Sequence, residues 1–244
     1  MAIFEEIGIE MLARYGHIIS GVTWIGLLYY FNFAQTPAFA AFEAGPRNEA
    51  FTKLVPRALW WFRWGAASTL AFGLLLFALG MGGDFAPFDD MQSIATLTIL
   101  AGMLFGIIMF LNVWLVIWPN QKILIANAEG VLAGREANPA AAAAGRKAAC
   151  ASRTNTLFSI PMLFFMVATG HLVPFGGYDT TAGGDRAIWY IVVLLVAIVF
   201  EANALRAPAV GKPEAWYIDQ HKNTIIAGFA LLAVLYVVME ILFG

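Results

Sequence analysis

Six long apolar stretches, separated by segments that carry most of the charges, dominate the pattern of the chain. An apolar run of about 20 residues is long enough to cross the hydrocarbon core of a bilayer as a helix. The runs are continuous rather than alternating, which indicates helices and not strands. The pattern predicts an all-α, polytopic transmembrane helical bundle with about six spans, at 12–34, 59–81, 94–118, 156–173, 187–205 and 224–243.

The segments between the predicted spans include three that are typical of helices outside the bilayer. The first connection contains the helix-like stretch 47–54, and the third contains the amphipathic QKILIANAEGVLAGR and the alanine-rich stretch 140–149. Alanine has the highest helix propensity. The chain contains no sequence repeat and no segment that reads as a soluble second domain, so residues 1–244 are interpreted as one integral membrane domain.

Basic residues predict the orientation, because they are retained on the cytoplasmic side. The N-terminal segment and connections two and four hold only Arg14 and Arg186. This bias predicts that both termini are non-cytoplasmic. The other twelve basic residues lie in or beside connections one, three and five: Arg47, Lys53, Arg57, Arg63, Lys122, Arg135, Arg146, Lys147, Arg153, Arg206, Lys212 and Lys222.

Composition agrees with a membrane protein and excludes some functions. The chain is 61% hydrophobic and 12% charged, about half the charged fraction of a soluble domain. It has no basic stripe that could follow a phosphate backbone, so no nucleic-acid partner is expected. The lone cysteine, Cys150, excludes an internal disulfide and a thiolate metal cluster, and there is no CxxCH motif for covalent haem attachment.

Two histidines are predicted to lie at the same depth. His17 and His171 each lie about one turn from the outer end of their span. Neutral imidazole is a common axial ligand of haem iron, and helix bundles build such sites from facing side chains. Gly21 and Trp24 share the face of His17, at helical spacings of four and seven. These four residues are the candidate cofactor site; the alternative is that each histidine only bonds to a carbonyl or a lipid headgroup.

A second set of polar residues is predicted at the cytoplasmic ends of the spans. Arg63 and Glu201 lie at similar depth, which suggests an ion pair. The pair could simply fix helix packing. The cluster could instead form a polar cavity that holds a planar anion or relays protons. The candidate substrate or proton-path residues are Arg63, Asn112, Arg153, Asn155, Glu201 and His221.

Four sequence blocks carry a family resemblance. They are RYGHIISGVTWIGLLYYFNF at 14–33, WFRWG at 61–65, NVWLVIWPNQK at 112–122 and SRTNTLFSIPMLFFM at 152–166, the last leading to His171. In order and spacing, from about residue 12 to at least residue 171, they resemble the membrane domain at the N-terminus of bacterial membrane-bound urate oxidases, also called urate hydroxylases. The histidine followed by a tryptophan–glycine pair in the first span is also similar to membrane proteins that bind haem b.

The resemblance implies a protein of the bacterial inner membrane that holds haem b between His17 and His171. Longer members of the family carry a c-type cytochrome after the membrane domain, so the electron acceptor expected here is a separate protein such as a cytochrome c. The positions of Arg63, Asn112, Arg153 and Asn155 also match polar positions of the family. The chain departs from the family pattern in having Thr154 where the pattern has a histidine.

These observations leave three hypotheses open. The first is a membrane haem oxidoreductase that acts on urate or a similar small molecule. The second, favoured by Thr154, is a non-catalytic haem-binding or structural subunit of a larger membrane complex. The third is a transporter, which the membrane carboxylate Glu201 permits, although the chain lacks the paired interrupted spans of a repeat-built carrier.

Overall fold

The structure, a computed structural model, describes residues 2–80, 93–172 and 185–244, and every regular element in these ranges is a helix. The second predicted connection and most of the fourth lie outside the described residues. The elements, in chain order, are the 3₁₀ turn η1 (Ala2–Phe4), α1 (Glu6–Tyr29), the π-helical η2 (Tyr30–Gln35), α2 (Thr36–Ala41), α3 (Ala44–Lys53), α4 (Val55–Gly80), α5 (Ile94–Leu111), the π-helical η3 (Asn112–Ile117), α6 (Trp118–Leu132), α7 (Ala141–His171), α8 (Asp185–Arg206), the 3₁₀ turn η5 (Pro213–Ala215), α9 (Trp216–Asp219) and α10 (His221–Phe243).

Four helices in the described ranges are long and apolar enough to cross a membrane: α4, the continuous helix Ile94–Leu132, α8 and α10. They correspond to predicted spans two, three, five and six. The helices α1 and α7 are also long, with 24 and 31 residues, but they are less apolar because they carry Arg14, His17, Asn155 and Ser159 among others. The described residues are therefore all-helical, with four helices that could cross a membrane, and the two more polar long helices carry the candidate histidines.

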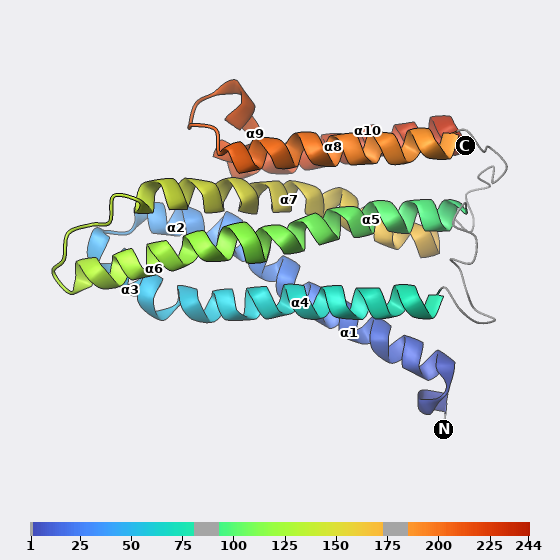
Figure 1. The fold of residues 1–244 in the computed structure, drawn as a ribbon, viewed down its shortest axis with the longest axis horizontal. Coiled ribbons are helices and arrows are strands. Elements are labelled where there is room, and N and C mark those ends of the chain that lie inside the picture. The colour runs from blue at the N-terminus through green and yellow to red at the C-terminus, as the bar shows by residue number, and fades with distance from the viewer. Residues whose placement is uncertain (1, 81–92, 173–184) are drawn as a thin grey trace.

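Helix α7 lies in the middle of the bundle. Figure 1 shows α8 and α10 along one side of it and α1 and α4 along the other, with α5 next to it. α7 packs mainly against α5, α10 and α6 and buries residues along most of its length. The rings of Phe158 on α7 and Phe105 on α5 are in contact, with centroids 4.9 Å apart. Most of the polar groups of α7 are consequently enclosed by other helices.

Two helices are much longer than a bilayer is thick. The 39 residues of Ile94–Leu132 rise about 58 Å, and those of α7 about 46 Å, against a hydrocarbon core of about 30 Å. The halves nearest the α6–α7 connection pack together, and α3 packs on α6 at the same end (Figure 1). The stretches 47–54, 121–135 and 140–149 are largely helical, as predicted, and the third and fourth predicted spans are parts of longer helices than predicted.

Two π-helical turns lie beside α7. η2 follows α1 and contains Asn32, and η3 follows α5 and begins at Asn112. In η2 the amide of Asn32 donates to the carbonyl of Leu28 at 2.9 Å, and the hydroxyl of Thr36 donates to the carbonyl of Phe31 at 2.7 Å. Wide turns of this kind are often found at functional sites, and both lie beside α7.

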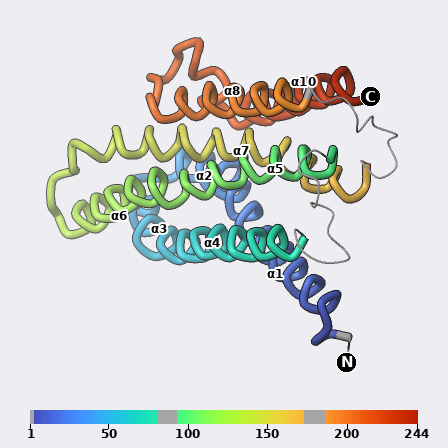
Figure 2. The backbone as a smooth tube through the Cα atoms, turned by 45° about the vertical axis from the view of Figure 1, so that its right-hand side comes forward, coloured from blue at the N-terminus to red at the C-terminus, as the bar shows by residue number. Residues whose placement is uncertain are grey.

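Glycine permits the closest contact between α7 and α10. A Cβ added at Gly228 would lie 3.1 Å from the carbonyl oxygen of Leu157 and 2.5 Å from Cδ1 of Ile160. The two backbones therefore touch at this point, and they run in the same direction (Figures 1 and 2).

Replacement of this glycine tests the packing. Gly228→Ala is expected to lower the free energy of unfolding by about 1–3 kcal/mol, because the backbone of α7 cannot move away from the new methyl group as a flexible side chain could. Thermal unfolding in detergent, followed by circular dichroism, measures the effect. Gly26→Ala is the matched control, since a Cβ at Gly26 meets nothing within 4 Å; equal stability of the two variants would contradict the packing.

Candidate functional site

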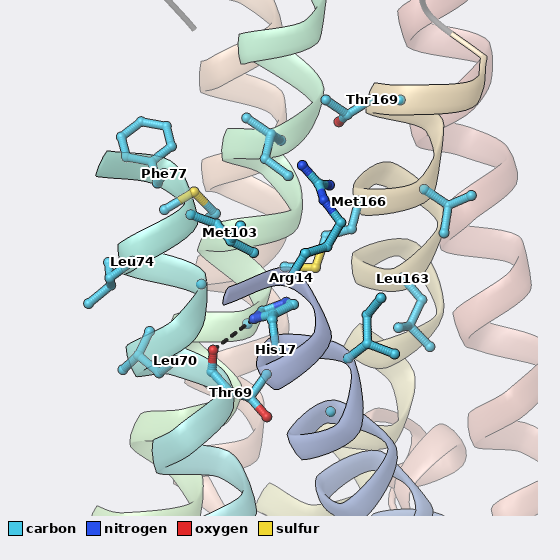
Figure 3. Close-up of a pocket in the computed structure, with 18 of the residues that line it drawn as sticks. Arg14, His17, Thr69, Leu70, Leu74, Phe77, Met103, Leu163, Met166 and Thr169 are labelled. Carbon is cyan, nitrogen blue, oxygen red and sulfur yellow. Dashed lines mark hydrogen bonds between the residues drawn. The ribbon is translucent and has the colours of Figure 1, made fainter. Parts of the chain in front are cut away.

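A large cavity lies between α1, α4, α5 and α7. It has a volume of about 1470 Å³, and apolar side chains make up most of its lining (Figure 3). Its polar lining includes both predicted histidines, His17 and His171, together with Arg14 and Thr169. The cavity, called the histidine pocket below, is the place where the first and fourth predicted spans bring their candidate ligands together.

The divergence of α1 from α7 creates the pocket. The two helices meet where the hydroxyls of Tyr29 and Ser159 are 2.8 Å apart. Beyond that contact the rest of α1 tilts away from the bundle, as Figures 1 and 2 show. Lining residues such as Val22 and Val167 are 63% and 59% exposed. The pocket is therefore open between α1 and α7, on a flank where the exposed side chains are apolar.

The ring of His17 is held in a defined orientation. Its Nδ1 lies 2.8 Å from the carbonyl oxygen of Thr69 on α4, the bond that Figure 3 draws. A carbonyl only accepts, so Nδ1 carries the proton and Nε2 of the neutral ring keeps its lone pair. Gly73 makes room for the ring, because a Cβ there would lie 3.0 Å from Cε1 of His17.

His171 repeats this pattern on α7. It lies in the last turn of the helix, is exposed, and its Nδ1 is 3.2 Å from the carbonyl oxygen of Val167. The same argument makes Nδ1 the donor, which in the neutral tautomer leaves Nε2 as the acceptor. Both histidines thus line one pocket, each with Nδ1 hydrogen-bonded to a backbone carbonyl and Nε2 available as a ligand. This arrangement is typical of metal-binding histidines.

The other two predicted cofactor residues also line the pocket. Gly21 leaves space, since a Cβ there would have only Cγ2 of Thr69 nearby, at 3.9 Å. Trp24 is 2% exposed and packs where α1 crosses α4, and its indole Nε1 has no hydrogen-bond partner among the described residues. Gly65 allows this crossing, because a Cβ there would lie 3.2 Å from the backbone nitrogen of Trp24.

The donor set suits haem better than a bare metal ion. No group of three or more His, Cys, Asp or Glu side chains that could hold an ion occurs in the described ranges. Two imidazoles alone are too few for a closed protein site. Haem needs only axial ligands, because its macrocycle provides the other donors. A wide apolar pocket with two oriented imidazoles fits that requirement.

The amides predicted at the other end of the bundle do come together. One amide nitrogen, Nδ2 of Asn112, donates to Oδ1 of Asn155 and to Oε2 of Glu201, both at 2.9 Å. Asn155 in turn donates to the carbonyl of Met109 at 2.9 Å. Both asparagines are buried and Glu201 is half-buried. This amide network ties α5, η3, α7 and α8 together.

The hypothesis of an Arg63–Glu201 ion pair is wrong. The guanidinium of Arg63 lies over the ring of Trp118, 3.5 Å from its centroid, and 5.5 Å from that of Trp114. Its Nε donates to the carbonyl of Leu59 at 3.2 Å. Indole faces attract a cation. Among the described residues, no carboxylate lies at ion-pair distance from Arg63. Arg63 therefore lies outside the amide network.

The two remaining predicted residues lie apart from that network. Arg153 on α7 is 7% exposed, and His221 is the exposed first residue of α10. The ring of His221 lies 6.0 Å from that of Phe33 in η2. Asn32 of η2 donates to the hydroxyl of Ser152, the neighbour of Arg153, at 2.8 Å. Arg153 and His221 thus belong to a separate region where η2, α7 and α10 converge.

Sequence reasoning missed the role of Tyr217, which lies in the short helix α9. Its hydroxyl is 3.4 Å from that of Thr154 and accepts a bond from the amide of Asn203 at 3.1 Å. Burial raises the pKa of Tyr217, so the phenol stays protonated and can donate. Tyr217 lies in a connection with no periodic pattern in the sequence. Its contact with Thr154 depends on the packing of α9 against α7, which only the structure shows.

Comparison with known proteins gives one match. The model of the family described as urate oxidase N-terminal matches residues 88–201, which confirms the resemblance found in the sequence. The match contains the blocks at 112–122 and 152–166 and His171, whereas His17 and the blocks at 14–33 and 61–65 precede it. Searches of curated proteins and of solved structures found no match.

A double-mutant cycle tests the amide network. Asn112→Ala is expected to destabilise the protein by about 1 kcal/mol more when Glu201 is present than in a Glu201→Leu background, because it leaves the carboxylate without its donor. Unfolding in detergent of the two single variants and the double variant gives the coupling energy. Additive effects would contradict the contact.

Proposed function

We propose that the chain is a membrane haem protein that takes electrons from urate or a similar small oxidisable molecule. The premise is the match of residues 88–201 to the urate oxidase N-terminal family. The observation that carries the proposal is the histidine pocket, into which α1 and α7 each bring one imidazole with Nδ1 bonded to backbone. His17 and His171 would hold haem b, which when bound accepts and releases single electrons.

The residues of the chain would orient the ligands and set the surroundings of the group. The carbonyl of Thr69 fixes the tautomer of His17 and strengthens its Nε2 as a donor to iron. Arg14 also lines the pocket, where it pairs with Glu10. The apolar side chains that make up most of the lining would lower the dielectric constant around the iron.

The oxidisable substrate is proposed to bind beside the haem in the histidine pocket. At about 1470 Å³ the pocket exceeds the 300–1000 Å³ that is usual for one small ligand. Arg153 lies 18 residues before His171 on α7, a rise of about 27 Å, so a molecule at that end could not touch a group held by His171. The substrate would lose electrons and protons, a separate acceptor such as cytochrome c would gain the electrons, and water would take the protons.

The proposed topology has six spans in a bacterial inner membrane. Four are the helices that are apolar enough to cross a membrane, and α1 and α7 are the other two. The buried asparagine of α7, Asn155, has partners within the bundle, so it does not exclude a span. α1 presents apolar side chains outside the pocket lining, such as Met11 and Ile19, 51% and 50% exposed, as a lipid-facing helix does. Both termini are then non-cytoplasmic, and the α6–α7 overhang is cytoplasmic.

One observation favours the alternative of a non-catalytic haem-binding or structural subunit in a larger complex. Thr154, at the position where the family pattern has a histidine, is fully buried and faces the hydroxyl of Tyr217. Its surroundings are those of a packing contact rather than of a reacting group. The two functions differ in whether a substrate reduces the haem.

Cysteine accessibility tests the topology. In a Cys150→Ala background, Phe4→Cys in whole cells is expected to react with a membrane-impermeant maleimide, because the N-terminus is proposed to face outward and Phe4 is 76% exposed. Glu136→Cys, in the exposed α6–α7 connection, is expected to react only after the membrane is permeabilised. Reaction of both residues from the same side, or the reverse order, would contradict the six-span orientation.

Absorption spectra of the purified protein, oxidised and then reduced, test the haem. The wild-type protein is expected to show a b-type spectrum, and His17→Ala and His171→Ala are each expected to retain less than about a tenth of it. His221→Ala is the matched control, because this third histidine lies outside the pocket, and it should keep the full spectrum. A well-folded wild-type protein without haem, or haem retained by both alanine variants, would overturn the proposal.

Addition of urate to the oxidised protein then separates the two candidate functions. Reduction of the haem by urate, with no other reductant, is the result expected of the oxidoreductase. A stable oxidised spectrum that only dithionite reduces is the result expected of a non-catalytic subunit.

A further inference from the structure

Arg153 is a buried cation without a counter-charge. Arg153 is 7% exposed, and its Nη1 has no hydrogen-bond partner among the described residues. The ion pairs of the described ranges join Arg14 to Glu10, Lys53 to Glu49 and Arg146 to Asp219, and none includes Arg153. An unpaired buried charge is costly, so an arginine in this state is a candidate for binding an anion from outside the chain.

The register of α7 against α10 shows which way Arg153 faces. Leu157, one turn further along α7, has its carbonyl against Gly228 of α10. Residues four apart in a helix share a face, so Arg153 lies on the face of α7 that α10 covers. The two helices run in the same direction (Figure 2), and one turn before Gly228 is Thr224. Arg153 is therefore level with the first turn of α10.

The first turn of α10 itself favours an anion. The 23-residue helix begins at His221, and its N-cap, Gln220, makes no side-chain capping bond. The backbone N–H groups of such a first turn have no partners within the helix, and the helix dipole places partial positive charge there. η2 closes the region from the other side, through the contact of Phe33 with His221. A buried guanidinium and an uncapped helix start thus converge.

Neighbouring carboxylates are engaged elsewhere. Glu201 accepts from Asn112 in the amide network. Asp219, just before α10, pairs with Arg146 at 2.9 Å and accepts from the backbone of Gly211 at 2.8 Å. No carboxylate among the described residues lies at ion-pair distance from Arg153, so one bound anion would supply its missing counter-charge. The planar fork of a guanidinium matches a carboxylate with two parallel N–H donors.

We propose that Arg153 and the first turn of α10 form a binding site for a small planar monoanion of the carboxylate type. The site goes beyond the proposed haem chemistry, because it lies about 27 Å along α7 from His171 and shares no residue with the histidine pocket. With the topology proposed above, it serves an anion arriving from the cytoplasmic side.

Anion-dependent thermal unfolding of the purified full chain in detergent tests this site, with formate as the probe and chloride at equal ionic strength as its control. Formate is expected to raise the melting temperature of the wild-type protein in a saturable way, and chloride is not. Arg153→Met is expected to abolish the formate response. Arg153→Lys, which keeps the charge and loses the fork, is expected to bind formate roughly tenfold more weakly.

The anion-free protein provides a second readout. Arg153→Met is expected to unfold at the same temperature as the wild type or higher, because it removes an unpaired buried charge, whereas a packing or hydrogen-bonding role for Arg153 would make it unfold lower. Arg57→Met is the matched control, since Arg57 is exposed, and it should keep the formate response. His17→Ala should also keep it, so failure of the haem proposal does not affect this one. A formate response that survives in Arg153→Met, or equal responses to formate and chloride, would overturn the site.

Discussion

Polar groups on a helix inside a bilayer must find partners in the bundle, because lipid offers none, and in the proposed topology α7 is the helix on which this constraint bears most. Asn155 is held by Asn112 and by the carbonyl of Met109. Ser159 bonds to Tyr29 of α1. The hydroxyl of Thr169, two residues from His171, lies 2.9 Å from that of Thr98 on α5. Each contact attaches α7 to another helix, so the satisfaction of its polar groups also determines the arrangement of the fold.

The same constraint explains why the two ends of the bundle differ. At the end with the π-helical turns, η2, η3, α9 and the start of α10 pack around α7, and the asparagines there have partners. Arg153 is the buried cation of this region without a carboxylate at ion-pair distance among the described residues. At the other end α1 leaves α7 beyond Tyr29, and the space between them is the histidine pocket. In His17 and His171, Nδ1 is hydrogen-bonded to a backbone carbonyl. Nε2 of each ring is therefore left for a ligand from outside the chain.

The sequence was sufficient for the helices, because these depend on the apolar period and on the charges between the apolar runs. It grouped His17 with His171, which line one pocket, and Asn112 with Asn155 and Glu201, which form one network, but it also grouped with them Arg153 and His221, which lie elsewhere. It could not supply rotation about each helix axis, which decides which neighbour a side chain meets. Arg63 was expected at the depth of Glu201, but its side chain faces Trp118. The sequence predicted helix at 121–135 and 140–149, but not that these stretches are continuous with the apolar helices beside them.

Low-temperature electron paramagnetic resonance of the oxidised, purified protein tests most directly whether imidazoles from α1 and α7 share one iron. The account predicts a low-spin ferric spectrum typical of two axial imidazoles, which changes to a high-spin spectrum or disappears when either His17 or His171 is removed. A high-spin ferric spectrum in the unaltered protein, or a spectrum that is insensitive to both substitutions, would contradict it.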